Sequence, residues 1–327
     1  MPLFLTEADV RAVLPMPDLI ETMQAALVEY SGGRTQQPLR TVLEVGDQKA
    51  FFGVMPAFLP GMSALGTKLV TVYGSNAAVG LPTHLATIVM LDTGTGAPIA
   101  FLDGRYITEA RTAAVSAVST RWLARKDART LAVIGTGVQA RSHLEAIACV
   151  RTLHEVKVWS PNPDHRDSFV NDMRAHVKPT TLSSVTSARE AVDSADIIVL
   201  ATSSRSAVIH NDWVADGTHI CAVGACRPDQ REMDGALVAR ARLFVDSRIG
   251  ALAEAGDIVL AMREGLITPD SIAGELGEVA ATRVDARRDD AEVTLFKSLG
   301  MAVEDVAAAQ LACARARDRG LGRTISL

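Results

Sequence analysis

The length, composition and charge of the chain exclude several classes of protein. Its 327 residues exceed what one small core needs and predict about two domains. The formal net charge of −5 argues against a nucleic-acid partner, although a few local cations can still bind a small anion. Hydrophobic residues make up 48% of the chain, yet no apolar run reaches the roughly 20 residues of a membrane span and the first residues lack the basic flank of a signal peptide, so we expect a cytoplasmic protein with no membrane partner.

The first third of the chain changes from helical to strand patterns. Thr6, with Asp9 three residues on, predicts a capped short helix, and a second helix starts near Pro17 and ends at Gly32-Gly33. Short apolar runs punctuated by glycine and proline then predict a mostly antiparallel sheet. These runs are 41–43, 51–52, 69–73, 88–91 and 99–102. An alanine-rich helix is expected over 109–124.

The middle of the chain alternates strands and helices, which predicts a parallel sheet covered on both faces. The expected strands are 130–134, 156–160, 196–202, 219–223, 243–246 and 293–296. We therefore expect an α/β fold with a Rossmann-type doubly wound domain at 119–301. Residues 1–118, joined by a terminal helix within 302–327, would form an α+β domain for substrate binding and dimerisation. The four cysteines show no metal-ligand spacing, so we expect free thiols and no metal site.

A glycine-rich turn follows the first strand of this alternation. Gly135 permits a tight turn, Gly137 lets the backbone approach a pyrophosphate, and Ala140 allows close packing of the helix on the strand. Thr136, Val138 and Gln139 complete the turn at a helix N-terminus, where free N–H groups can bind phosphate. An ordinary glycine turn is the alternative, but the strand before it and the amphipathic helix after it favour a dinucleotide site.

The next strand indicates which dinucleotide binds. Glu155 has the spacing of an NAD-specific acid, but it precedes the strand and lies over 10 Å from its useful end at about 3.3 Å per residue. That end carries Ser160 and Asn162 and no acid to repel a 2′-phosphate, with Arg166 a few residues further. We therefore expect NADPH as the cofactor, with NADH tolerated.

Three cations, Arg40, Lys68 and Arg111, stand among uncharged neighbours. Each by itself could be a surface charge. Together with the glycine turn they lie in stretches through which the chain resembles the ornithine cyclodeaminase/mu-crystallin family over essentially its whole length. These stretches include Thr67-Lys68-Leu69-Val70-Thr71, Pro82-Thr83-His84, 107–116, Ala222-Val223-Gly224-Ala225, Glu254-Ala255-Gly256-Asp257 and Phe296-Lys297-Ser298-Leu299-Gly300-Met301-Ala302.

The resemblance implies roles for these residues. Arg40, Lys68 and Arg111 would converge on a substrate carboxylate, which must be paired with cations when it is buried. Candidate cofactor contacts beyond the glycine turn are Thr83, His84, Arg111, Ser160, Asn162, Thr202, Val223, Gly224 and Ser298. Glu254 and Thr83 would face the substrate. Structural alternatives stay open: His84 as a hydrogen-bonded core histidine, Ser298 as a helix N-cap, and Glu254 as a solvent-facing helix residue.

Departures from the family pattern favour one reaction. Cyclodeaminases carry an aspartate where this chain has Cys226 and a glutamate where it has Gly53, so a second substrate amine would be left unpaired here. The resemblance is greatest to the branch of ketimine reductases and Δ1-pyrroline-2-carboxylate reductases. Reductive amination of pyruvate, ornithine cyclisation and non-catalytic NADPH-dependent ligand binding remain alternatives.

The expected chemistry is reduction of a small cyclic ketimine carboxylate. Δ1-Pyrroline-2-carboxylate and Δ1-piperideine-2-carboxylate are the two leading substrates, giving L-proline or L-pipecolate as the family's stereochemistry implies. Lys68 is the candidate catalytic proton donor, because a lysine between two arginines should have a lowered pKa. A water held by Glu254 or Thr83 is the alternative donor. A homodimer through the first domain's sheet is expected from the resemblance alone.

Overall fold

The protein is described by a computed structural model covering residues 1–46, 50–177 and 181–326. Contacts divide the chain into two compact units. Unit 1 holds Met1–Arg111 with Gly300–Leu327, and unit 2 holds Thr112–Leu299. The sequence placed these boundaries at 118/119 and 301/302. The structure has the first boundary at 111/112, earlier within the same helix α3 (Arg105–Leu123), which starts four residues before the expected helix.

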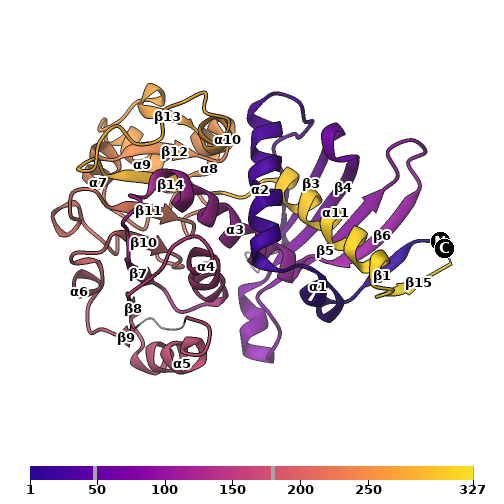
Figure 1. Ribbon diagram of the computed structural model, residues 1–327, viewed down its shortest axis with the longest axis horizontal. Helices are drawn as coiled ribbons and strands as arrows, with labels where there is room; N and C mark the ends of the chain where they lie inside the picture. Colours follow the sequence, from indigo (N-terminus) through magenta and orange to yellow (C-terminus); the bar gives the residue numbers. More distant parts are fainter. Residues whose placement is uncertain (47–49, 178–180, 327) are drawn as a thin grey trace. The chain divides into compact units, whose positions relative to one another are not determined.

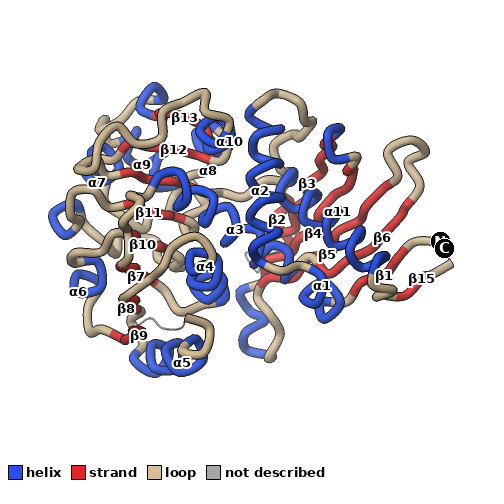
Figure 2. Tube along the Cα trace, viewed as in Figure 1, coloured by secondary structure: helices blue, strands red, loops and turns tan. Residues whose placement is uncertain are grey.

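Unit 1 is built on a seven-stranded sheet with the order β15-β1-β6-β5-β4-β3-β2. Figure 2 shows the strands in red. Strands β2 to β6 form an antiparallel meander, as the sequence predicts. Their bounds are Thr41–Val45 (β2), Ala50–Leu59 (β3), Ala64–Val72 (β4), His84–Leu91 (β5) and Pro98–Asp103 (β6). Sequence patterns missed β1 (Leu3–Leu5) and β15 (Arg323–Thr324), because such short strands carry little periodicity.

Among the described residues, unit 1 has three α-helices besides the start of α3. The first, α1 (Glu7–Val13), has the predicted capping box between Thr6 and Asp9, and the second, α2 (Met16–Ser31), ends at Gly32. The C-terminal helix α11 (Ala302–Asp318) packs against α2 and against strands β3, β4 and β5. In Figure 1 this yellow helix lies over the sheet of unit 1 although the whole of unit 2 separates the two in sequence. The C-terminal helix thus belongs to unit 1.

The two faces of the unit 1 sheet differ in burial. One cross-strand row consists of Met55, Lys68, Ile88, Leu102 and Leu5. All of these side chains are buried, so this row lies on the face that the helices cover. The opposite face carries Leu43 and Leu85, which are 60% and 40% exposed, together with Phe4 at 43%. Lys68 therefore stands in a row of apolar side chains beneath α11.

Unit 2 contains an eight-stranded sheet with the order β13-β12-β14-β11-β10-β7-β8-β9. Every described pairing in it is parallel. The bounds are Thr130–Ile134 (β7), Glu155–Trp159 (β8), Thr181–Ser184 (β9), Ile197–Leu200 (β10), His219–Ala222 (β11), Arg242–Val245 (β12), Ile272–Glu275 (β13) and Thr294–Lys297 (β14). The strand order reverses between β7 and β10, which is the switch point where a doubly wound sheet binds a dinucleotide. The predicted Rossmann-type fold is confirmed.

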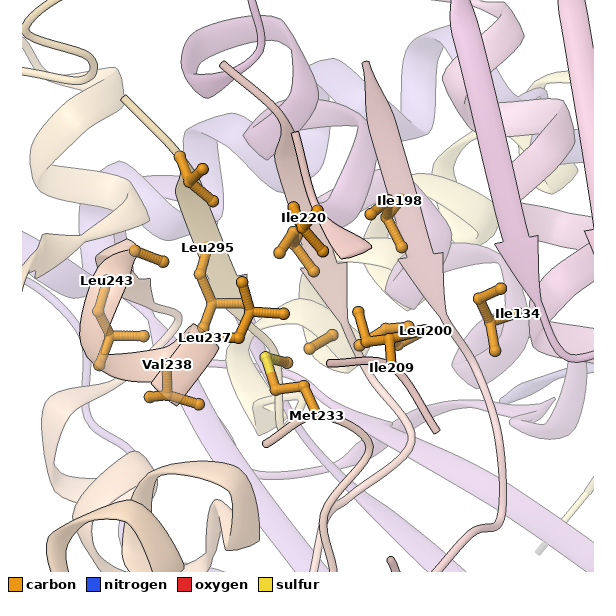
Figure 3. Close-up of a cluster of buried hydrophobic side chains, with 14 of the residues drawn as sticks. Ile134, Ile198, Leu200, Ile209, Ile220, Met233, Leu237, Val238, Leu243 and Leu295 are labelled. Carbon is orange, nitrogen blue, oxygen red and sulfur yellow. The ribbon is translucent and has the colours of Figure 1, made fainter. Parts of the chain in front are cut away.

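Both faces of this sheet are covered, because successive strand residues point to opposite sides. Ile198 and Leu200 of β10 enter a core that includes Ile220, Leu237 and Leu295, and Figure 3 shows these side chains gathered on one side of the strands. Ile197 and Val199 point into the other core. The helices are α4 (Val138–Ala148), α5 (Pro163–Met173), α6 (Ala188–Val192), α7 (Gly235–Arg240), α8 (Arg248–Glu254), α9 (Gly256–Arg263) and α10 (Leu276–Ala280). Among the described residues no helix is long and apolar enough to cross a membrane.

Candidate functional site

The glycine turn joins β7 to α4 at the switch point of unit 2. Gly135 has φ +118°, and a Cβ there would overlap the carbonyl of Ala201, so only glycine fits. Gly137 precedes the first residue of α4, and a Cβ built on it meets no described atom within 4 Å. Ala140 is fully buried, as close packing of α4 on the sheet requires. The turn therefore fits a pyrophosphate approaching the free N–H groups of α4.

The end of β8 lies next to this turn. The Thr136 hydroxyl is 3.3 Å from the Ser160 hydroxyl, and Gly135 donates its N–H to the carbonyl of Trp159 at 2.8 Å. Arg166 donates from Nη1 to the Ser160 carbonyl at 2.7 Å, which holds its guanidinium at this end of the strand. Asn162 caps α5 by accepting the N–H of Asp164. Glu155 is the first residue of β8, at the other end, as the sequence argument required.

The remaining cofactor candidates lie at the carboxyl ends of the next strands. Thr202 and Gly224 donate their backbone N–H groups to opposite oxygens of Glu232, both at 2.7 Å. Val223 directly follows β11 and is buried. Ser298 directly follows β14, and its hydroxyl lies 3.4 Å from Asp246. The alternative that Ser298 caps the next helix is wrong, because α11 begins only at Ala302.

The cations of unit 1 meet two carboxylates that the sequence analysis did not single out. Lys68 Nζ lies 2.6 Å from Asp305 Oδ2, and Arg111 Nε lies 3.0 Å from Asp305 Oδ1. Arg111 Nη1 lies 2.6 Å from Glu304 Oε2. These four residues, which we call the α11 charge cluster, are at most 4% exposed. Lys68 and Arg111 are thus brought together through a shared aspartate.

Burial and charge set the protonation of this cluster. The pKa of Lys68 is lowered to about 8, because burial and repulsion from Arg111 together outweigh the attraction of Asp305. The pKa of Lys68 is therefore lowered, as the sequence predicts, but the larger cause is burial and not repulsion from arginine. His84, on the same face of the sheet as Lys68, has its pKa lowered to about 4 by burial and by Lys68 and Arg111, so its ring is neutral at neutral pH.

Arg111 also lies against the backbone that leads into α11. Gly300 has φ +82°, and a Cβ there would overlap the Arg111 guanidinium. Glu304 accepts the backbone N–H of Met301 at 3.1 Å as well as the guanidinium. Acidic side chains in the first turn of a helix are stabilised by the positive end of its dipole. The start of α11 thus holds Arg111 in one orientation.

The other sequence-predicted residues occupy different parts of the two units. Arg40 is half-buried and directly precedes β2, so the sheet register, continued by one residue, places it opposite Met55 in the row of Lys68. Thr83 is exposed, and its carbonyl accepts the N–H of Tyr73. Glu254 is half-buried at the end of α8 in unit 2.

Asp305 and Glu304 could have been noticed from the sequence by one signal. They are two adjacent acids in the first turn of an otherwise alanine-rich, buried helix. Buried carboxylates need cationic partners. First-turn acids are also common on exposed helices, where they need no partner, so the sequence does not reveal that these two face Lys68 and Arg111.

Comparison with known proteins shows which family the chain belongs to. Residues 1–320 match the model of the ornithine cyclodeaminase/mu-crystallin family. The chain belongs to this family. A ketimine reductase mu-crystallin of Mus musculus is 39% identical over 314 residues, covering 95% of this chain and 96% of the relative.

Two solved structures of similar proteins have the same fold. The Δ1-pyrroline-2-carboxylate reductase of Thermococcus litoralis, in complex with NADH and L-proline, is 39% identical with a TM-score of 0.96, covering 99% of this chain and 100% of its own. An archaeal alanine dehydrogenase dimer with bound NAD is 32% identical with a TM-score of 0.94, covering 99% of each chain. This member of the ornithine cyclodeaminase/mu-crystallin family is an oxidoreductase that uses a nicotinamide dinucleotide.

The family departures have identifiable places in the structure. Gly53 lies in β3, where a Cβ would come within 3.0 Å of Val70. Cys226 lies in the segment after β11, and its thiol is 3.2 Å from the carbonyl of Val223. Neither position carries a carboxylate that could pair with a second substrate amine.

Proposed function

We propose that this protein reduces a small cyclic ketimine carboxylate, with Δ1-pyrroline-2-carboxylate and Δ1-piperideine-2-carboxylate as the substrates. The observation that carries the proposal is the α11 charge cluster, which buries an ammonium and a guanidinium side by side. The Thermococcus litoralis relative, whose structure holds NADH and L-proline, supports this substrate class.

The cations of unit 1 favour a substrate that carries a carboxylate. Arg111 belongs to the α11 charge cluster, and the sheet register, continued by one residue, puts Arg40 in the row of Lys68. A guanidinium fork suits a carboxylate geometrically, because it can pair with both of its oxygens. Thr83 and Glu254 are proposed as the further substrate contacts.

Lys68 is the proposed proton donor. The bound reduced dinucleotide supplies a hydride for the imine carbon. An imine accepts hydride more readily when its nitrogen is protonated, and a pKa of about 8 lets the Lys68 ammonium release its proton near neutral pH. Asp305 holds the ammonium in place at 2.6 Å. His84 is neutral and is not the acid at that pH.

The experiment that tests this function compares substrates on one preparation. Reduced-cofactor oxidation is followed with each cyclic ketimine, with pyruvate plus ammonia, and with no substrate, and ammonia release from ornithine is followed with oxidised cofactor. We expect the highest kcat/KM with one of the ketimines. Faster turnover of pyruvate plus ammonia would assign the protein to reductive amination. Tight cofactor binding without turnover would show a ligand-binding role.

We also propose NADPH as the preferred cofactor, with NADH accepted. The end of β8 presents Ser160 and Asn162, with the guanidinium of Arg166 fixed beside them. A guanidinium can pair with a 2′-phosphate, and the described segment around it has no carboxylate where an NAD-specific acid would stand. The similar solved structures contain NADH or NAD, so paired kinetics with both reduced cofactors decide the preference.

A homodimer through the outer face of the unit 1 sheet completes the proposal. That face exposes large apolar side chains, including Leu43 and Leu85, whereas the row of Lys68 on the other face is buried. Exposed apolar patches of this kind mark association surfaces. The archaeal alanine dehydrogenase relative is a dimer. Light scattering of the purified protein should give twice the chain mass, and a monomeric mass would refute this assignment.

A further inference from the structure

Three fully buried charged residues in unit 2 have no role in the function proposed so far. Lys297 Nζ, at the end of β14, lies 3.0 Å from Asp257 Oδ2 in the first turn of α9. Glu232 lies in the segment between β11 and α7 and is fully buried as well. Glu232 and Asp257 are joined, because Asp257 Oδ1 accepts the backbone N–H of Glu232 at 2.7 Å. We call these three residues the β14 charge cluster.

The carboxylate of Glu232 spans the carboxyl ends of two neighbouring strands. Oε1 accepts the N–H of Thr202, two residues after β10. Oε2 accepts the N–H groups of Gly224 at 2.7 Å and Ala225 at 3.3 Å, just after β11. One buried side chain therefore fixes the backbone that leaves both strands.

These strand ends lie on one defined side of the switch point. The adenosine half of a dinucleotide belongs to the side of β7 and β8, where the glycine turn and the ribose-binding end are. The nicotinamide half then belongs to the side of β10 and β11. Glu232 thus organises backbone on the nicotinamide side, while the adenosine side has its own separate hydrogen bonds at Gly135 and Ser160.

The three charges hold one another in place. Burial raises the pKa of Glu232, and Asp257 raises it further, whereas Lys297 lowers it. Burial alone would lower the pKa of Lys297, but the attraction of Asp257 and Glu232 helps to outweigh this and raise it. Removing the Lys297 ammonium would leave Asp257 as a buried carboxylate without its cationic partner. Such a cluster costs stability compared with apolar packing, so a role in geometry accounts for it better than a role in folding energy.

We propose that Glu232, positioned by Lys297 and Asp257, is a positioning residue that shapes the nicotinamide-binding side of the site and leaves the adenosine side unaffected. The proposal rests on the dinucleotide binding of the proposed function and is independent of its substrate. It explains why two family stretches, those containing Asp257 and Lys297, include charged residues that are completely buried.

The test separates the two halves of the dinucleotide by comparing NADH with ADP-ribose, which lacks the nicotinamide. Dissociation constants for both are measured by calorimetry on the wild type and on Glu232→Gln, which keeps the side-chain shape but loses one acceptor oxygen. We expect NADH binding to weaken about tenfold while ADP-ribose binding changes less than about twofold. Lys297→Met should act in the same direction.

A matched control is available at the opposite edge of the same sheet. Asp196 Oδ2 accepts the N–H groups of Arg129 and Thr130 at 2.8 and 2.9 Å, beside the amino ends of β7 and β10. Asp196→Asn removes a comparable backbone-capping carboxylate, so it should lower the melting temperature and leave the NADH to ADP-ribose affinity ratio at the wild-type value.

Each outcome leads to one conclusion. If Glu232→Gln weakens the binding of NADH and ADP-ribose equally, or changes neither, the positioning role is overturned. If Glu232→Gln does not fold, the milder Asp257→Asn is measured instead, with ADP-ribose binding as proof of its folding, and an unchanged affinity ratio there overturns the role. A wild type that binds neither ligand would overturn dinucleotide binding itself, which is a different failure.

Discussion

The two units each bury a lysine against an aspartate, but the surrounding charges differ. In the α11 charge cluster Lys68 shares Asp305 with Arg111, and its pKa falls to about 8. In the β14 charge cluster Lys297 is accompanied by Asp257 and Glu232, with no second cation among them, and its pKa rises. Burial is equally complete at both lysines. The comparison teaches that the balance of neighbouring charges decides which buried ammonium can release a proton.

The largest effect is expected from removing either cation of the α11 charge cluster. Lys68→Ala or Arg111→Ala should lower kcat/KM for the ketimine by at least about 100-fold, near 2.7 kcal/mol, because each removes a proposed substrate contact and Lys68 the proton donor. Steady-state kinetics measure this, with the exposed Lys126→Ala as control. Wild-type kinetics in both variants would remove the pocket assignment.

Two buried histidines that are hydrogen-bonded to hydroxyl groups extend the comparison to the pH dependence of stability. His143, held by Ser116 at 2.9 Å, and His219, held by Thr294 at 3.0 Å, have pKa values lowered by burial to about 4 and about 3. Because the unfolded chain binds these protons near pH 6.5, stability is complete above that pH and is lost as pH falls towards the folded-state pKa values. The loss at pH 5 should be about 2 kcal/mol for each histidine.

Urea unfolding at pH 7 and pH 5 measures this effect. His219→Gln should reduce the difference between the two pH values by about 2 kcal/mol, whatever it does to the stability at pH 7. The exposed His165→Gln is the control. An unchanged difference in the His219 variant would mean that this ring is not kept neutral by its surroundings.

A smaller effect is expected from neutralising the shared aspartate of the α11 charge cluster. Asp305 raises the pKa of Lys68, so Asp305→Asn should move the alkaline fall of kcat/KM from about pH 8 to lower pH. A shift of about one unit corresponds to about tenfold in rate at about pH 9. The wild type and Asp305→Asn are compared in the same buffers, so that ionisation of the substrate affects both profiles equally. If the alkaline fall of kcat/KM stayed at about pH 8 in Asp305→Asn, Lys68 would not be the group whose titration causes it.

The smallest effect concerns the adenosine side of unit 2, away from both clusters. Arg166→Ala should lower kcat/KM with NADPH about fivefold, near 1 kcal/mol, because it removes a partly exposed cation from the proposed 2′-phosphate site. Values with NADH should not change. The exposed Arg174→Ala, just after the same helix, controls for loss of charge. Equal effects on both cofactors would contradict the proposed NADPH preference.

The success of sequence reasoning differed between local and distant features. Thr6 and Asp9, Gly32, and the glycine turn act within a few residues of their own position, and the structure shows each as predicted. The doubly wound sheet followed from alternating patterns that also act locally. The three-residue strand β1 gave no such signal, because its pairing with β6 involves residues almost a hundred positions away.

The candidate site shows the same division. Lys68 and Arg111 drew attention because they are charges in apolar segments, but the sequence contains nothing that pairs them with Asp305, 194 positions after Arg111. Glu232 was missed for a similar reason. Its partners Thr202 and Gly224 offer only backbone N–H groups, which every non-proline residue has.

The return of α11 to unit 1 has a consequence for how the protein is made on the ribosome. Unit 2 is one continuous stretch, whereas Lys68 and Arg111 are translated long before Asp305. At roughly 5–20 residues per second, about ten to forty seconds pass between the two ends of that ion pair. Unit 2 can fold while unit 1 still waits for its last helix, and a chaperone that shields the early meander in that interval would raise the yield of native enzyme.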